Sequence, residues 1–373
     1  MRNWRAKSAA IAAVSALALV TACSSDNEDN GNGDTGDTGG NGGEETSELS
    51  GTIVGAGASS QEAAMGAWMA GFNALHPDVT VEYDPSGSGA GREQFIAGGT
   101  DFGGTDAYFS EEEGELEAAT ERCGEIVEIP VYVSPIAVAF NLEGIDSLNL
   151  SPSVIAQIFN QQITTWNDEA IAADNPDVEL PDSAITVVNR SDPSGTTENF
   201  VEYLAAAAPE DWPHEVSDEW PVSGGEAAQG TSGVSQAISG GNGTIGYIDA
   251  SQARELGSVN VGVGEEFVPY SPEAAASVLA VSERVEGRGQ YDFAYDLARD
   301  TTEAGTYPIV LVSYAMACAT YDDAATAELV QAFLGYMISA EGQEAAAAEA
   351  GSAPLSDELR TEFQAAVDAI SAA

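Results

Sequence analysis

Residues 184–208 read AITVVNRSDPSGTTENFVEYLAAAA, and the fold is best understood outward from this stretch. The apolar run before Asn189 is typical of a strand, and the segment after Thr196 is typical of a helix. The turn between them carries the guanidinium of Arg190, the hydroxyls of Ser194 and Thr196, and the free backbone N–H groups of a helix start. Such a set of donors around one point is suited to holding an oxyanion.

The same strand, turn and helix device occurs twice before this stretch. GTIVGAGASS ends at Ser59 and Ser60 and leads into an amphipathic helix, while VTVEYDPSGSGAG places Ser88 in a glycine-rich turn. A third strand end, TDFGGTD, terminates in Asp106. Because parallel strands bring their carboxyl ends to one edge of a sheet, the sequence predicts an α/β fold with a site at that edge.

Two long apolar runs separate the halves of the chain. They read IVEIPVYVSPIAVAFNL at residues 126–142 and TYPIVLVSYAMAC at residues 306–318. Both are expected to be buried strands that pass between two lobes. The segment after them is expected to be helical, with four core residues on one face: Leu329, Phe333, Tyr336 and Met337. Residues 232–235, in a short helix of the second lobe, are a candidate further contact to the site.

The N-terminus has the pattern of an export signal. Residues 1–22 combine a basic start with an apolar run too short to span a bilayer, and VTAC, ending at Cys23, resembles the lipobox of bacterial lipoproteins. Residues 23–48 are therefore expected to be a lipidated cysteine and a disordered, acidic, glycine-rich tether. This predicts a protein anchored by lipid at the extracellular face of the cell membrane.

The charge of the chain is strongly negative, at −50 with 61 acidic and 11 basic residues. Removal of the predicted signal takes away Arg2, Arg5 and Lys7, which lowers the charge to −53 and leaves no lysine. Such a surface repels nucleic acid and anionic lipid, so a nucleic-acid partner is excluded. Adaptation to a salty or an alkaline exterior accounts for the acidity, and the sequence leaves both open.

The inventory of reactive residues argues against catalysis. The chain has two histidines, His76 and His214, each beside a proline, and no GxSxG elbow. It has no HExxH motif, no close cysteine cluster and no calcium loop of the EF-hand kind, so no metal and no cofactor are expected. We therefore expect a binding protein and not an enzyme.

The chain resembles the phosphate-binding proteins of Pst-type ABC transporters over essentially all of residues 49–373. The resemblance is carried by four motifs that follow the lipobox in the order GAGASS, PSGSGAG, DFGGTD and RSDPSGT. That resemblance implies a two-lobed periplasmic-binding-protein fold of type II with a hinge of two crossing strands. It also implies a monomer that passes phosphate to a membrane permease driven by a cytoplasmic ATPase. The anion contacts carried over by the resemblance are Ser59, the backbone of Ser60, Ser88, Asp106, Arg190, Ser194, Gly195 and Thr196, with Asp192 orienting the arginine. One departure is visible, since the family often has threonine and an aromatic residue where this chain has Ser59 and Ser60.

An acidic side chain in an anion site has a physical reason in this setting. The carboxylate of Asp106 can accept a hydrogen bond from an anion that still carries a proton, as hydrogen phosphate does and sulfate at neutral pH does not. Sulfate would instead meet an unpaired like charge in a dry cleft. We therefore expect Asp106 to select anions that carry a proton, and Arg190 to attract the anion by its positive charge.

The predicted lobes are residues 49–133 plus 310–373 and residues 134–309. Cys123 and Cys318 then fall in one lobe and are a candidate disulfide, with two buried free thiols as the alternative. Three other functions stay open at the level of sequence. They are a receptor for another oxyanion such as sulfate, tungstate or phosphonate, an extracellular phosphatase, and a surface sensor or adhesin without a role in transport.

Overall fold

The computed structural model describes residues 49–253 and 255–373. The predicted signal, Cys23 and the tether lie outside these residues. In the described part of the chain, no helix is both long enough and apolar enough to cross a membrane.

The central feature is a mixed sheet with the strand order β2-β1-β3-β13-β4-β8-β6-β7 and three further strands at its side. The strands on this path are β2 (Val79–Asp84), β1 (Gly51–Gly57), β3 (Phe102–Thr105), β13 (Val310–Cys318), β4 (Ile126–Asn141), β8 (Thr244–Asp249), β6 (Thr186–Arg190) and β7 (Glu226–Ala228). The three at the side are β9 (Gly257–Val263), which pairs with β4, and β5 (Ser147–Leu150) and β10 (Glu266–Val268), which pair with β9.

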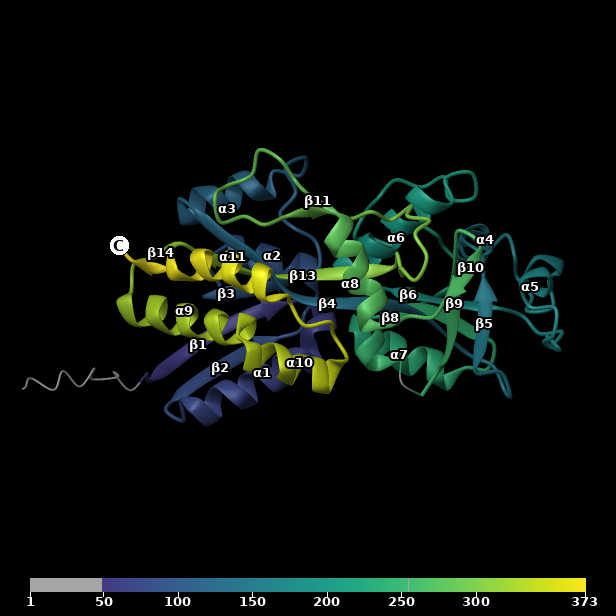
Figure 1. The fold of residues 1–373 in the computed structure, drawn as a ribbon, viewed down its shortest axis with the longest axis horizontal. Coiled ribbons are helices and arrows are strands. Elements are labelled where there is room, and N and C mark those ends of the chain that lie inside the picture. Colours follow the sequence, from purple (N-terminus) through teal and green to yellow (C-terminus); the bar gives the residue numbers. More distant parts are fainter. Residues whose placement is uncertain (1–48, 254) are drawn as a thin grey trace, which may run out of the picture. The chain divides into compact units, whose positions relative to one another are not determined.

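The two long apolar runs form β4 and β13, which are buried strands, as the sequence predicted, and which lie next to each other at the middle of this order (Figure 1). The first part of β4 pairs antiparallel with β13, from Ile126 opposite Cys318 to Pro135 opposite Val310. The remainder of β4 pairs with β8. A single continuous strand therefore belongs to both halves of the sheet, and both of these strands are buried almost throughout.

One half of the sheet is built from the parallel strands β2, β1 and β3. Its helices are η1 (Ser59–Gln61), α1 (Glu62–Leu75), α2 (Ser88–Ile96), α3 (Glu115–Cys123), α9 (Ala324–Ile338), α10 (Ala340–Ala350) and α11 (Asp357–Asp368). A short ladder of β14 (Thr320–Tyr321) and β15 (Ser371–Ala372) lies beside them. The four predicted core residues of α9 are all buried, which confirms the predicted face.

The other half contains β8, β6 and β7, again parallel along the β8-β6-β7 path. Its helices are α4 (Pro152–Phe159), α5 (Glu169–Asp174), α6 (Gly195–Ala207), α7 (Gly230–Gly240), η2 (Ala250–Gln252) and α8 (Pro272–Val281). The helix expected after Thr196 is α6, and it begins two residues earlier, at Gly195, because Ser194 caps it. The ring of Phe200 on α6 stacks on the rings of Tyr247 and Trp220, and these contacts hold the helix in position over the sheet.

The two short strands β11 (Glu283–Arg284) and β12 (Tyr295–Asp296) pair with each other and enclose a loop that we call the arm, residues 283–296. The arm lies within predicted lobe two, yet its backbone bonds to Glu128 at the start of β4, and Phe293 packs edge-on against Phe363 of α11. Residues 49–373 fall within one compact unit, so the predicted lobe boundaries stay a prediction.

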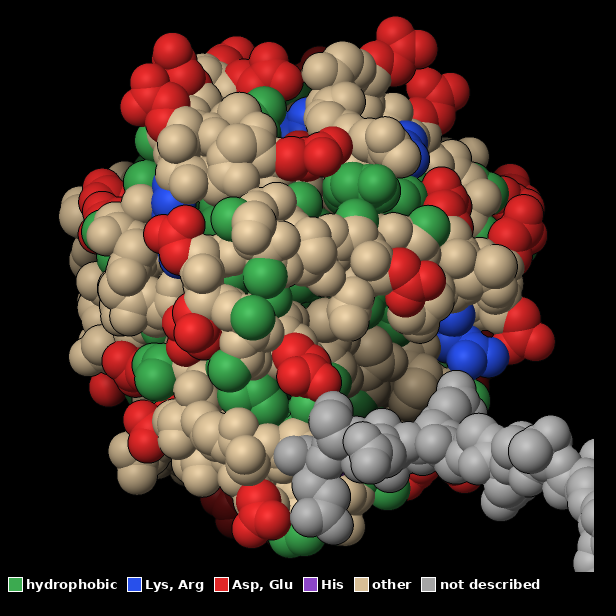
Figure 2. Space-filling view, turned by 90° about the vertical axis from the view of Figure 1, so that its left-hand side faces the viewer, with side chains coloured by type: hydrophobic (Ala, Val, Ile, Leu, Met, Phe, Trp, Pro, Cys, Tyr) green, Lys and Arg blue, Asp and Glu red, His purple; other side chains and the backbone are tan. Residues whose placement is uncertain are grey.

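Acidic side chains are spread over the face shown in Figure 2, with few basic ones between them. The negative charge is spread over this face and is not gathered in one patch, as expected for a chain with a net charge of −50.

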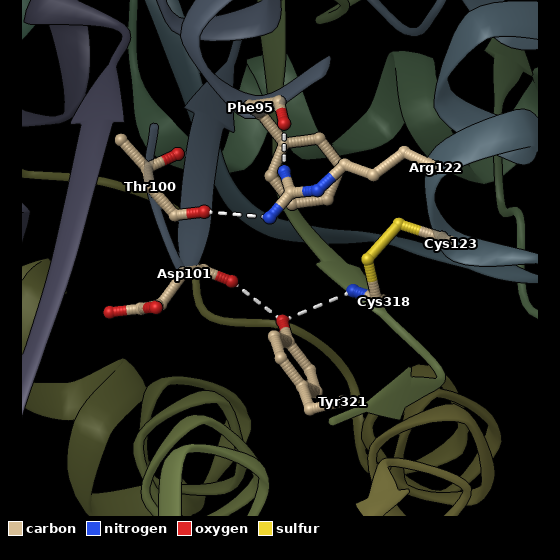
Figure 3. The surroundings of a disulfide bond; sticks show 7 residues. All are labelled: Phe95, Thr100, Asp101, Arg122, Cys123, Cys318 and Tyr321. Carbon is tan, nitrogen blue, oxygen red and sulfur yellow. Dashed lines mark hydrogen bonds between the residues drawn. A yellow bond between two sulfur atoms is a disulfide. The ribbon is translucent and has the colours of Figure 1, made fainter. Parts of the chain in front are cut away.

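The structure joins Cys123, the last residue of α3, to Cys318, the last residue of β13, by a disulfide (Figure 3). Tyr321 fixes the strand end beside it, since its hydroxyl donates to Asp101 O at 2.6 Å and accepts from Cys318 N at 3.1 Å. Arg122 donates to the carbonyl of Thr100 at 2.8 Å and stacks on the ring of Phe95.

Candidate anion-binding site

The predicted site residues come together between the two halves of the molecule. Ser59 and Ser60 follow β1, Ser88 begins α2 after β2, and Asp106 follows β3. Arg190 ends β6, and the next three predicted residues form the start of α6. All eight are buried: Ser59, Ser60, Ser88, Asp106, Arg190, Ser194, Gly195 and Thr196.

Glycines allow the strand ends of the first half to approach one another closely. Gly57 has a φ of 145°, and a Cβ there would lie 1.9 Å from the carbonyl oxygen of Gly104 on β3. Since no side chain fits in that space, glycine at position 57 is required for Ser59 and Asp106 to share one edge of the sheet.

The carboxylate of Asp106 accepts hydrogen bonds from three hydroxyl groups. Ser60 donates to Oδ1 at 2.6 Å, Ser313 donates to Oδ1 at 2.7 Å, and Thr196 donates to Oδ2 at 2.9 Å. Burial raises the pKa of Asp106 above its ordinary value, while these three hydroxyls and the charge of Arg190 lower it. One lone-pair position on Oδ2 remains for a further donor.

Three serine oxygens accept backbone N–H groups. Ser59 Oγ accepts from Thr231 N at 3.1 Å, Ser88 Oγ accepts from Asp106 N at 3.1 Å, and Ser194 Oγ caps α6 by accepting from Thr197 N at 3.3 Å. A hydroxyl that accepts in this way keeps its proton for donation. The site thus holds several O–H groups that can donate to an anion.

Arg190 is held by the carboxylate predicted to orient it. Its Nε donates to Asp192 Oδ1 at 2.9 Å, and one terminal nitrogen contacts Oδ2. Asp192 also accepts from Gly230 N at 3.1 Å. This fork uses two of the five guanidinium N–H donors, so three remain for a ligand.

The two halves touch at the site itself. Besides the bond from Thr196 to Asp106, the side-chain amide of Asn199 donates to the carbonyl of Asp106 at 2.7 Å. A Cβ at Gly195 would lie 2.7 Å from Asp106 Cβ and 2.9 Å from Ser88 Oγ. The structure therefore has the closed arrangement, with Asp106 and Arg190 on opposite walls.

A cavity of about 400 Å³ borders this contact, with Asp106, Asn199, Tyr314, Glu198 and Glu202 in its lining. A second cavity, of about 430 Å³, lies beside Arg190 and also has Asp192 and Trp220 in its lining. Burial raises the pKa of Glu198 to about 8, the charges of Glu202 and Asp218 add to this, and Arg92 opposes it. An anion that approaches through the first cavity passes several acidic side chains.

Sequence reasoning missed four residues of the site. They are Gln61, Asn199, Thr231 and Ser313. Ser313 had a visible signal, since it is a polar residue within an apolar run, whereas Gln61 had none. The candidate contact at residues 232–235 is wrong: Ser232 is exposed, Ser235 donates to Gln252 O, and Thr231 reaches the site in their place.

The chemistry of the site is that of binding a tetrahedral oxyanion. Donors surround it, namely one guanidinium, several hydroxyls and the N–H groups at the starts of α2 and α6, and a single carboxylate accepts. Among the described residues, no group of three or more His, Cys, Asp or Glu side chains is arranged to hold a metal ion. His214 bonds to Asn160 and His76 packs on Phe72, so neither is placed beside a site serine.

Comparison with known proteins gives a consistent result. Residues 42–341 match the model of a PBP superfamily domain. The chain is 35% identical over 328 residues to the phosphate-binding protein PstS 3 of Mycobacterium leprae, covering 86% of this chain and 87% of that protein. It is 35% identical over 326 residues to PstS 2 of Mycobacterium tuberculosis, covering 84% of this chain and 86% of that one.

Solved structures agree on the fold. A phosphate-bound structure of the periplasmic phosphate-binding protein PfluDING is 21% identical, with a TM-score of 0.67 over 84% of this chain and 93% of that one. The phosphate-binding protein of Stenotrophomonas maltophilia is 19% identical, with a TM-score of 0.63 over 85% of this chain and 94% of that one. At these identities the likeness establishes the two-lobed fold.

Proposed function

Because the chain belongs to the PBP superfamily and, within it, to the PstS phosphate-binding proteins, we propose that it captures inorganic phosphate outside the cell and delivers it to an ABC importer. It is a solute-binding protein and not an enzyme. The observation that carries the choice of phosphate is the single carboxylate, Asp106, in a cleft of donors opposite Arg190.

The proposed contacts divide the work of binding. Arg190 supplies the positive charge, and the hydroxyls of Ser59, Ser88, Ser194 and Thr196 donate to phosphate oxygens. The N–H groups of Ser60, Gly195 and the start of α6 add further donors. The hydroxyl of Thr196 donates to Asp106 in the structure, so phosphate binding exchanges that bond for one to a phosphate oxygen.

Selectivity follows from the protons of the ligand. Hydrogen phosphate can donate its own O–H to the remaining lone pair of Asp106 Oδ2, and sulfate cannot. A sulfate oxygen against this carboxylate would be a buried contact between like charges. Binding sites use repulsion of this kind to exclude a competing ligand.

Calorimetric titration with phosphate and with sulfate tests the proposal. Wild type should bind phosphate far more tightly than sulfate. Asp106→Asn should lose at least about tenfold in phosphate affinity and gain measurable sulfate binding, because an amide can donate to sulfate. Asp322→Asn, an exposed control, should behave as wild type. Equal binding of both anions by wild type would overturn the assignment.

We propose the location of the protein at the membrane from the sequence pattern of its N-terminus. A lipid on Cys23 and the tether that ends at residue 48 would hold the binding domain at the outer face of the membrane as a monomer. Cys23→Ser should release the protein into the medium and abolish incorporation of a labelled fatty acid. Retention of the variant in the membrane fraction would contradict the anchor.

We also propose that the Cys123–Cys318 bond forms in the exported protein. An oxidising exterior favours it, and the structure brings the two Cα atoms to 4.9 Å. Mass spectrometry of peptides with and without reductant should show the linked pair in the unreduced sample alone. Two freely alkylated thiols would show the bond to be absent.

A further inference from the structure

Ser313 reaches the site from a strand that otherwise presents apolar side chains. It lies in β13, fully buried, between Val312 and Tyr314. The pairing of β13 with β4 shifts register between Ser313 and Tyr314, and Val131 of β4 is skipped. Such irregularities re-aim a side chain locally, and here the side chain that is turned to Asp106 is the hydroxyl of Ser313.

Gln61 lies behind Ser313 and is also fully buried. Its Nε2 donates to Ser313 Oγ at 2.6 Å and to the backbone carbonyl of Tyr314 at 3.1 Å. The carbonyl can only accept, so the amide nitrogen must face it. A flipped amide would set two oxygens against each other and leave Nε2 without an acceptor.

This orientation gives the hydrogen bonds one direction. Ser313 accepts from Gln61 and directs its own proton to Asp106 Oδ1 at 2.7 Å, in preference to the longer approach of 3.2 Å to Thr105 O. Gln61 Oε1 is buried and has no hydrogen-bond partner among the described residues. The hydrogen-bonding needs of the glutamine itself therefore do not explain its position. A buried leucine or methionine would fill the same space without leaving a polar atom unpaired.

We propose that Gln61 and Ser313 are specificity-determining positioning residues: the donor chain from Gln61 Nε2 through Ser313 Oγ to Asp106 Oδ1 keeps Asp106 an acceptor. The other carboxylate oxygen is thereby reserved for the proton of the ligand. The inference rests on the proposed function, since it explains how the phosphate site rejects anions that carry no proton.

The groups around Asp106 decide whether its carboxyl group is ionised or protonated, and the donor chain from Gln61 through Ser313 favours the ionised form. Arg190 faces it from β6, Tyr83 lies on β2 and Tyr132 on β4. Burial holds the pKa of both tyrosines well above their ordinary value, so of these three Arg190 is the charged one. Burial favours the protonated acid at Asp106, and loss of one hydroxyl donor would raise its pKa further. A protonated Asp106 could donate to sulfate.

The test uses the processed protein with Ser313→Ala and, as a second variant, Gln61→Met. Kd values for phosphate and sulfate are measured by calorimetry at pH 6, 7 and 8.5. At each pH the phosphate-over-sulfate preference is divided by that of wild type, which cancels the titration of phosphate itself. Ser134→Ala removes a buried serine of β4 that faces Leu311 across the ladder, and it serves as the matched control.

We expect Ser313→Ala to lose at least about tenfold in preference at pH 6 and to recover part of it at pH 8.5, because a higher pH favours the ionised carboxylate of Asp106. Gln61→Met should show the same trend with a smaller amplitude, and Ser134→Ala should stay within about twofold of wild type. Preference unchanged in both variants, or lowered equally at every pH, would overturn the inference. If wild type itself fails to prefer phosphate, the proposed function fails instead, and the two failures are therefore distinguishable.

Discussion

Gly195 is the residue at which the two walls of the cleft come closest. A methyl group there would press on Asp106 Cβ at 2.7 Å and on the N–H of Ala107 at 3.0 Å. Neither atom lies at the end of a flexible side chain, so the contact can be relieved only if the walls separate.

We therefore expect Gly195→Ala to weaken phosphate binding by at least about tenfold, which corresponds to about 1.4 kcal/mol. Calorimetry measures the affinity, and small-angle scattering should show a larger radius of gyration in the presence of phosphate. Gly240→Ala is the control, because a Cβ at this helical glycine meets nothing within 4 Å. It should bind normally and be slightly more stable, since alanine favours the helix. Normal affinity in Gly195→Ala would contradict the closed arrangement.

Glu198 should make the stability of the folded protein depend measurably on pH. Its pKa of about 8 in the folded protein, mainly from burial, exceeds the ordinary value of 4.5. Between these two values the folded chain keeps a proton that the unfolded chain has lost, so stability falls as pH rises from about 4.5 to about 8.

Glu198→Gln should remove this loss. The variant should unfold at a higher temperature than wild type at pH 8, by the equivalent of roughly 1 kcal/mol or more, and the difference should vanish near pH 4.5. Thermal unfolding followed by circular dichroism across this range measures it. Glu210→Gln, at an exposed position after the same helix, should show no such trend. A constant difference at all pH values would show that titration of Glu198 is not its cause.

The residues that sequence reasoning could place were those that end strands. Ser59, Ser88, Asp106 and Arg190 follow apolar runs, and the geometry of parallel strands brings such positions to one edge. Ser313 and Gln61 lie inside a strand and a helical turn, where one sequence does not show which polar side chain faces a site. Thr231 was missed because a helix of small polar residues offers several equivalent candidates.

At the level of elements, β4, β13 and α6 could be predicted because each is a long run with one periodicity. The arm could not. Its pairing with Glu128 joins positions about 160 residues apart, and the glycine-rich sequence between its two short strands has no sustained periodicity. Long-range ion pairs of this kind leave no local pattern.

The arm is held by a buried ion-pair cluster. Arg288 contacts Glu128 at 2.8 Å and Asp292 at 2.7 Å, and it also donates to the carbonyl of Phe109. Burial and the nearby charge of Asp292 raise the pKa of Glu128 well above its usual range. Removing the guanidinium leaves two carboxyl groups in a dry site.

Arg288→Met should therefore lower the free energy of unfolding by about 3–5 kcal/mol. The backbone amides of Glu128 and Phe293, which form the two hydrogen bonds between the start of β4 and the arm, should lose protection from hydrogen exchange. Adding Glu128→Gln to this variant should restore part of the loss, because one fewer acid is left unpaired. Arg360→Met removes an exposed pair with Asp357 and should change stability by no more than about 0.5 kcal/mol. Equal losses in the two arginine variants would show that the cluster is not what holds the arm.

At the scale of the whole molecule, the site must bind an anion within a protein of charge −50. Acidic side chains cover the face seen in Figure 2, and Glu111, Glu112, Glu198 and Glu202 line the cavity beside Asp106. The global field therefore opposes the approach of phosphate, whereas Arg190 and the hydroxyls act only at contact.

This separation predicts an unusual response to salt. Raising NaCl from 0.05 to 0.5 M shortens the Debye length from more than about 10 Å to about 4 Å, which screens the surface charges but not the buried contacts. Phosphate association should become faster with salt, by severalfold, while its dissociation changes little. Stopped-flow fluorescence can measure both rates, given five tryptophans in the chain and Trp220 in the lining of the second cavity.

A double variant, Glu111→Gln with Glu112→Gln, separates the local field from the global one. It removes two charges from the cavity beside Asp106 without touching a proposed ligand contact. If the acids of the cavity dominate, association at low salt should rise toward the high-salt rate of wild type, and the salt dependence should flatten. If the charge of the whole surface dominates, two charges among 61 will leave the slope nearly unchanged, and association should still accelerate with salt. Association that slows with salt, as it does for attractive steering, would mean that the donors of the cleft control the approach of phosphate as well as its retention.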